Sequence, residues 1–242
     1  MYIADLSKKN LLSKFKPCEL FCESEQKCKF LGINIFEPWN TFTCFAYIIS
    51  AIIIAFTTTS PDTISKSLKN LYVVSVIILG IGTGLWHGWH ILAFKIIDQI
   101  GMLLTVYTLL LCQITHRFDL TESIEYLTIL VPVLIVSIYF LKYKIVKYAS
   151  VIFIFCIFLT IIFMAYAGND GSLSFDMNLL IGLIALIIGK IVWIIDKKKI
   201  ISIHHFWHIL TGLSIFCFWQ SYSYNYDETK FSKHIKNSIT LT

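Results

Sequence analysis

The sequence predicts an all-α integral membrane protein, folded as a bundle of seven transmembrane helices. Hydrophobic residues make up 57% of its 242 residues and charged residues only 14%. The mean hydropathy of +0.73 lies far from that of a soluble domain. About seven apolar stretches approach the ~20 residues that a helix needs to cross a bilayer. They are Trp39–Phe56, Leu68–Trp86, Ile91–Ile114, Ile124–Leu141, Ile145–Ala167, Met177–Ile195 and Ser202–Gln220.

The stretches are continuously apolar, whereas the strands of a membrane β-barrel alternate between apolar and polar residues. Helices are therefore the predicted elements. The polar N-terminal segment, residues 1–37, lacks the apolar core of a cleavable signal peptide, so we expect the first span to act as the insertion signal. Residues 38–220 form the membrane domain, and we expect the polar C-terminal tail, residues 221–242, to be loosely ordered.

The positive charges between the spans predict the orientation. With seven spans, twelve lysines fall on the N-terminal face and six Lys or Arg residues fall on the opposite face. Basic residues favour the cytoplasmic side, so we expect a cytoplasmic N-terminus in a multi-pass protein. The net charge of +5 fits this anchoring and gives no indication of a nucleic-acid partner.

Histidines at the ends of the spans predict an intramembrane metal site near the N-terminal face. His87 ends the second span, His204 and His208 open the seventh, and Asp98 opens the third, so the topology brings all four to one side. Residues four apart project from one face of a helix, as His204 and His208 do, and Thr83 and His87 repeat this spacing. Three imidazoles and a water complete the tetrahedral site of a hydrolytic zinc.

Alternatives to this metal site stay open at the level of the sequence. Histidines at a membrane interface are often solvated polar caps, as we expect for His116 and His234, and the three candidates could converge by chance. His90, three residues after His87, is a competing ligand. We expect His205 to face elsewhere.

Several motifs occur in a fixed order along the chain. The segment Gly80–His87 (GIGTGLWH) is followed by Asp98, eleven residues after the histidine, and the segment His204–His208 (HHFWH) opens the last span. Together these segments resemble the signature of the alkaline ceramidases, which belong to the CREST group of seven-helix membrane hydrolases. Further likenesses to this family, from about residue 20 to residue 220, lie at Phe21–Glu23, Phe36–Thr41 and Trp193–Asp196.

The resemblance implies a zinc-dependent hydrolase. It would cleave the amide bond of ceramide-like N-acyl lipids, giving a fatty acid and a sphingoid base. His87, His204 and His208 would bind the zinc ion. Asp98 would take a proton from the attacking water and return it to the leaving amine. Thr83 stands where the family has serine, and would supply a hydroxyl near the metal or the developing oxyanion.

The resemblance also implies a candidate calcium site in the N-terminal segment. Glu23 and Glu37 match calcium ligands of the family, but Leu20 occupies the position of an aspartate and Glu25 that of an asparagine. Calcium takes six to eight oxygen ligands, so the site needs a replacement, which Glu19 could supply. The alternative is that these acids are solvated and balance nearby lysines.

Other functions stay open beside the amide hydrolase. The same residues fit an ester hydrolase acting on phospholipids or lipid anchors, or a receptor of the adiponectin or progestin type that keeps the zinc site. A transporter is disfavoured, because it would need polar residues deep within several spans. For Asp98, the alternative to catalysis is an ion pair with Lys95, about one turn earlier on the same helix.

Overall fold

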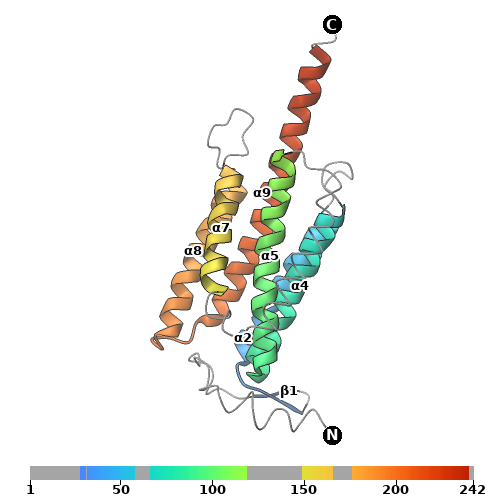
Figure 1. Cartoon of the computed structure of the whole chain (residues 1–242). Helices are drawn as coiled ribbons and strands as arrows, with labels where there is room; N and C mark the ends of the chain where they lie inside the picture. The colour runs from blue at the N-terminus through green and yellow to red at the C-terminus, as the bar shows by residue number, and fades with distance from the viewer. Residues whose placement is uncertain (1–27, 31, 58–65, 119–148, 166–175, 240–242) are drawn as a thin grey trace.

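The computed structural model describes residues 28–30, 32–57, 66–118, 149–165 and 176–239, and most of these residues are helical. The long helices run alongside one another as a bundle, and α9 extends beyond it towards the C-terminus (Figure 1). The helices are α2 (Pro38–Thr43), α3 (Phe45–Phe56), α4 (Lys66–Trp89), α5 (Leu92–Phe118), α7 (Ala149–Ala165), α8 (Met177–Lys197) and α9 (His204–Ile239). Two strands, β1 (Cys28–Phe30) and β2 (Ile33–Ile35), precede them.

Membrane character is supported by the described helices. In the part of the chain that the structure describes, four helical segments are long and apolar enough to cross a bilayer: Pro38–Phe56, Lys66–Trp89, Ala93–Thr115 and Met177–Lys197. They correspond to the predicted first, second, third and sixth spans. Helix α7 lies within the predicted fifth span, and α9 covers most of the seventh. The fourth, Ile124–Leu141, lies outside the described residues, so the count of seven and the orientation stay predictions.

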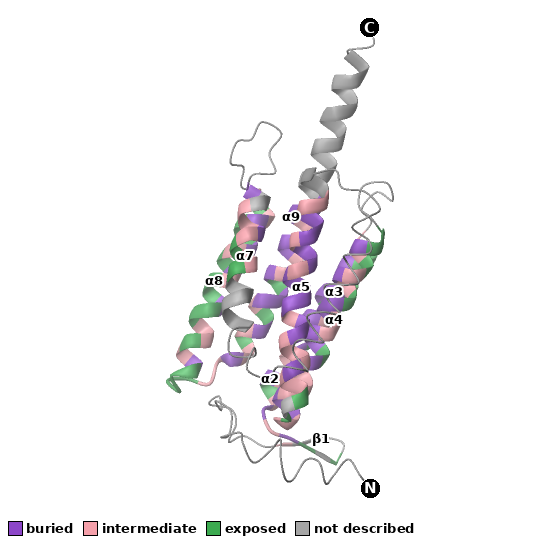
Figure 2. Ribbon diagram, in the orientation of Figure 1, coloured by how far each residue is buried: buried purple, intermediate pink, exposed green. Residues whose placement is uncertain are grey.

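The candidate spans differ in how far their side chains are buried. Of the four candidate spans, α5 is the most buried and α8 the least, as Figure 2 shows. One face of α8 is a row of exposed apolar side chains, which water would solvate poorly and lipid tails solvate well. The row comprises Leu180, Ile181, Ile184, Ile187, Ile188 and Ile191.

A short β-hairpin corrects the prediction of an all-α fold. Strands β1 and β2 pair antiparallel with Cys28 opposite Ile35, and Gly32 adopts the positive φ of +80° that the tight turn needs. Strands of three residues are too short to show a clear alternating pattern in the sequence. The backbone N–H of Phe36 then donates to the carbonyl of Gly88 at 3.1 Å, which ties the end of the hairpin to the end of α4.

Helix α9 corrects the prediction for the C-terminal tail. The helix continues to Ile239, although the predicted span ends at Gln220 and we expected loose order beyond it. Residues 221–239 contain neither glycine nor proline, the two residues that most disfavour a helix interior. The polar sequence therefore ends the apolar span without ending the helix.

Two glycines allow the backbones of α4 and α5 to touch. A Cβ atom on Gly101 would lie 2.5 Å from both Cα and N of Leu79, and one on Gly82 would lie 2.6 Å from the backbone N of Asp98. Both distances are shorter than van der Waals contact. Because Gly82 and Gly101 have no side chain, the N-terminal half of α5 can pack directly against the backbone of α4.

We expect Gly101→Ala to destabilise the protein by about 1–3 kcal/mol, because the added methyl group forces the two helices apart. The thermal denaturation midpoint of the purified protein in detergent measures the effect. Gly84→Ala, also in α4, is the matched control, since its Cβ would meet nothing closer than 3.7 Å. Equal midpoints for the two variants would contradict the packing described for Gly101.

Candidate metal centre

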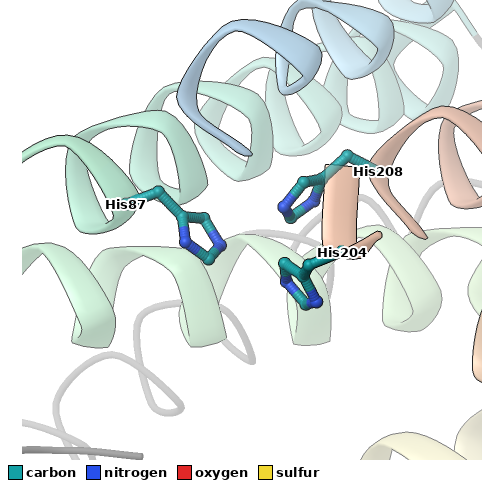
Figure 3. Close-up of side chains that lie close together, drawn as sticks. All are labelled: His87, His204 and His208. Atoms are coloured by element: carbon teal, nitrogen blue, oxygen red, sulfur yellow. The ribbon is translucent and has the colours of Figure 1, made fainter. Parts of the chain in front are cut away.

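Three histidines converge at the end of the bundle that carries α2 and the hairpin. His87 comes from the last turn of α4, and His204 and His208 come from the first turns of α9. Their rings point towards one another (Figure 3), and their candidate ligand atoms all lie within 4.8 Å of one another. All three side chains are buried. The predicted grouping is thus confirmed: the cluster could hold a metal ion.

The surroundings of His208 show which of its nitrogens faces the cluster. Its Nδ1 lies 3.3 Å from the hydroxyl of Tyr47, which is itself held 2.6 Å from the hydroxyl of Thr211. Its Nε2 is buried and has no hydrogen-bond partner among the residues that the structure describes. Leaving a buried polar atom unsatisfied is costly, and a metal ion would satisfy this one. The residues present therefore fit a bound metal.

A buried carboxylate lies behind His204. Asp196, at the end of α8, is fully buried, and its Oδ1 accepts a hydrogen bond from the backbone N–H of Ile203 at 3.2 Å. Its Oδ2 lies 3.9 Å from Nδ1 of His204, an ion-pair distance rather than a hydrogen bond. Carboxylates commonly orient metal-binding histidines in this way. The sequence pointed to the Trp193–Asp196 segment only as a family likeness, and it carried no signal for this contact.

A second buried carboxylate, Glu37, lies behind His87. Its Oε2 contacts Nδ1 of His87 and accepts a hydrogen bond from the side-chain amide of Asn40 at 2.9 Å. Its Oε1 lies 2.9 Å from Nε2 of His90. Burial opposes ionisation of Glu37, but the contacts with His87, His90 and Asn40 outweigh it and lower the pKa to about 2. Glu37 is therefore a carboxylate at neutral pH.

These contacts give Glu37 and His90 positions that the sequence did not predict. Glu37, expected as a calcium ligand, lies against His87, and His90, considered as a competing metal ligand, lies on Glu37 instead of in the cluster. The other candidate calcium ligands, Glu19, Glu23 and Glu25, lie outside the described residues. The calcium site therefore stays a prediction.

Thr83 and Asp98 form a pair beside the cluster. The hydroxyl of Thr83, one turn before His87 on α4, contacts Oδ1 of Asp98 and lies 2.7 Å from the carbonyl of Leu79. We expected this hydroxyl near the metal or the oxyanion, and the structure places it on the Asp98 carboxylate. As a whole residue, Asp98 is half-buried.

The remaining histidine of the α9 motif faces a different neighbour. His205 is not part of the cluster, as expected, and its ring lies 4.3 Å from the ring of Phe206. This arrangement makes His205 a matched control for substitutions of His204 and His208.

The chain was compared with protein-family models and with curated proteins. No protein-family model matches it, and no curated protein matches its sequence significantly. An assignment of function therefore depends on the chemistry of the cluster and on the motifs that surround it.

Proposed function

We propose that this protein is a zinc-dependent membrane hydrolase that cleaves the amide bond of ceramide-like N-acyl lipids, producing a fatty acid and a sphingoid base. The observation that carries the proposal is the buried cluster of His87, His204 and His208, with the Thr83–Asp98 pair beside it. The resemblance of the surrounding motifs to the alkaline ceramidases supplies the substrate class.

The donor set favours zinc among the common metals. Three neutral imidazoles suit zinc, and a catalytic zinc keeps a fourth position for water or substrate. Calcium and magnesium prefer oxygen ligands, which the cluster itself does not offer. When bound, zinc lowers the pKa of a water molecule and polarises a carbonyl group.

The protein's own residues then divide the remaining work. Asp98 accepts a proton from the attacking water and delivers it to the leaving amine, which needs a carboxylate that both substrate and water can reach. Its contact with Thr83, one turn before His87 on α4, supports this role. Thr83 orients the Asp98 carboxylate through its hydroxyl, in place of the oxyanion contact that the family likeness suggested.

Glu37, Asp196 and Tyr47 support the three histidines from outside. Glu37 and Tyr47 contact the Nδ1 atoms of His87 and His208, which leaves the Nε2 atoms of these two histidines to bind the metal, and Asp196 Oδ2 lies 3.9 Å from Nδ1 of His204. This set of outer contacts favours a metal site over three histidines that meet by chance.

A panel of lipid substrates tests the proposal and separates it from the ester-hydrolase alternative. The purified protein in detergent is incubated with ceramides of several chain lengths and with phospholipids, and released fatty acid is measured by mass spectrometry. We expect release from ceramide, lost in His87→Ala and retained in His205→Ala. Release from phospholipids alone would assign an ester hydrolase, and no release from either would favour the receptor alternative.

A further inference from the structure

His90 has a backbone conformation that favours glycine. Its φ of +52° lies in the left-handed region, which strains any residue with a Cβ atom. In the described residues, the other non-glycine residue with positive φ is Lys199 (φ +55°), which ends α8 in an ordinary helix-closing turn and has an exposed side chain. His90 likewise follows the last residue of α4, and its backbone N–H donates to the carbonyl of Trp86 at 2.7 Å, so its positive φ closes that helix. What distinguishes His90 is the place to which this turn directs its imidazole.

The imidazole of His90 is held in one orientation. Its ring stacks on the ring of Phe36 at a centroid distance of 5.2 Å, and it lies against Trp86 at 5.3 Å. This packing directs Nε2 to Oε1 of Glu37, at 2.9 Å. The left-handed turn and the two aromatic rings together therefore aim one nitrogen at one buried oxygen.

Glu37 connects this contact to the metal cluster. It is only 1% exposed, and its two oxygens are divided between His90 on one side and His87 with Asn40 on the other. A carboxylate of this kind fixes the tautomer and the ring orientation of the histidine that it contacts. Glu37 can orient His87 only if rotation of its own carboxylate is restrained. Oε2 contacts His87, and His90 restrains the other oxygen, Oε1.

We propose that His90 is a positioning residue for the metal ligand His87, acting through Glu37. The proposal rests on the zinc centre of the proposed function, but it does not depend on which lipid, if any, is cleaved. Without His90, Glu37 Oε1 loses the donor that the described residues give it, and the carboxylate no longer holds His87 in a single orientation. The expected consequence is weaker metal binding with the three ligands still in place.

His90→Gly separates positioning from a purely structural role. Glycine suits the left-handed φ, which offsets part of the stability lost with the ring contacts to Phe36 and Trp86, so the variant should still fold. Zinc affinity, measured on the full chain in detergent by competition with a chelator, should fall by about 10-fold. His90→Gln should recover part of the affinity, because its amide can donate to Glu37. Lys199→Gly relieves the same kind of strain at the end of α8 and should leave zinc affinity unchanged.

A double variant tests whether the effect passes through Glu37. If it does, the double variant Glu37→Ala/His90→Gly should bind zinc as tightly as Glu37→Ala alone. The visible spectrum of the cobalt-substituted protein gives a second readout, and His90→Gly should shift its bands. Wild-type zinc affinity in His90→Gly, or a full additional loss in the double variant, would overturn the proposal. Zinc bound by the wild-type protein without any lipid hydrolysis would reject the proposed function but leave this result intact.

Discussion

His208→Ala is expected to remove bound zinc from the purified protein. Nε2 of His208 is buried and finds no hydrogen-bond partner in the described part of the chain, so a metal ion is the group that best accounts for it. Removing a residue that only orients a metal ligand typically weakens metal binding by about 10–100-fold. His208→Ala removes one of the three ligands themselves, so zinc binding should weaken by more than this. Elemental analysis of the protein after dialysis measures the zinc content per chain.

The neighbouring histidine supplies the control for this experiment. His205→Ala changes the same helix, and its side chain lies outside the cluster, so zinc content should stay at the wild-type level. Full zinc content in His208→Ala, measured beside an equally loaded wild type, would mean that His208 is not a ligand.

Asp98→Asn should retain zinc and lose turnover. The amide keeps the size of the carboxylate and can still contact Thr83, but it cannot accept a proton at neutral pH. General acid and base catalysis contributes about 10²–10⁴-fold to the rate, so kcat for ceramide hydrolysis should fall by about that factor. KM should change little, because proton transfer to Asp98 stabilises the transition state and not the bound substrate.

Lys95→Met distinguishes catalysis by Asp98 from an ion pair. The ammonium of Lys95 lies 5.3 Å from the centre of the Trp86 ring, and Lys95 is about one turn before Asp98 on α5. If Asp98 only paired with Lys95, the two substitutions would change stability alike and spare turnover alike. We expect turnover to be lost in Asp98→Asn and kept in Lys95→Met.

The sequence predicted the convergence of the three histidines, because it depends on helix periodicity and on where the spans end. His204 and His208 lie four residues apart on one helix, and His87 ends another helix at the same face, so spacing and topology together predicted their convergence. The apolar runs likewise predicted the ends of the described helices to within a few residues, except for α9, which continues to Ile239, well past the predicted end at Gln220. Hydropathy predicts the positions of the spans because each apolar residue of a span is favoured in lipid independently of how the helices pack.

The outer contacts of the cluster could not be predicted, because they depend on the paths of connecting segments. Glu37 reaches His87 through the hairpin and its backbone bond to Gly88, and neither has a clear sequence signal. Asp196 reaches His204 through the turn between α8 and α9. The contact of His90 with Glu37 is also hidden, because it depends on where the turn after α4 directs the imidazole.

Removal and return of zinc tests the central claim most directly. The wild-type protein is stripped of metal with a chelator, incubated with one defined ceramide, and then supplied with a single equivalent of zinc, while released fatty acid is measured. We expect no release from the stripped protein and recovery of release with zinc, but not with magnesium. Release that persists after complete removal of zinc would contradict a zinc-dependent hydrolase.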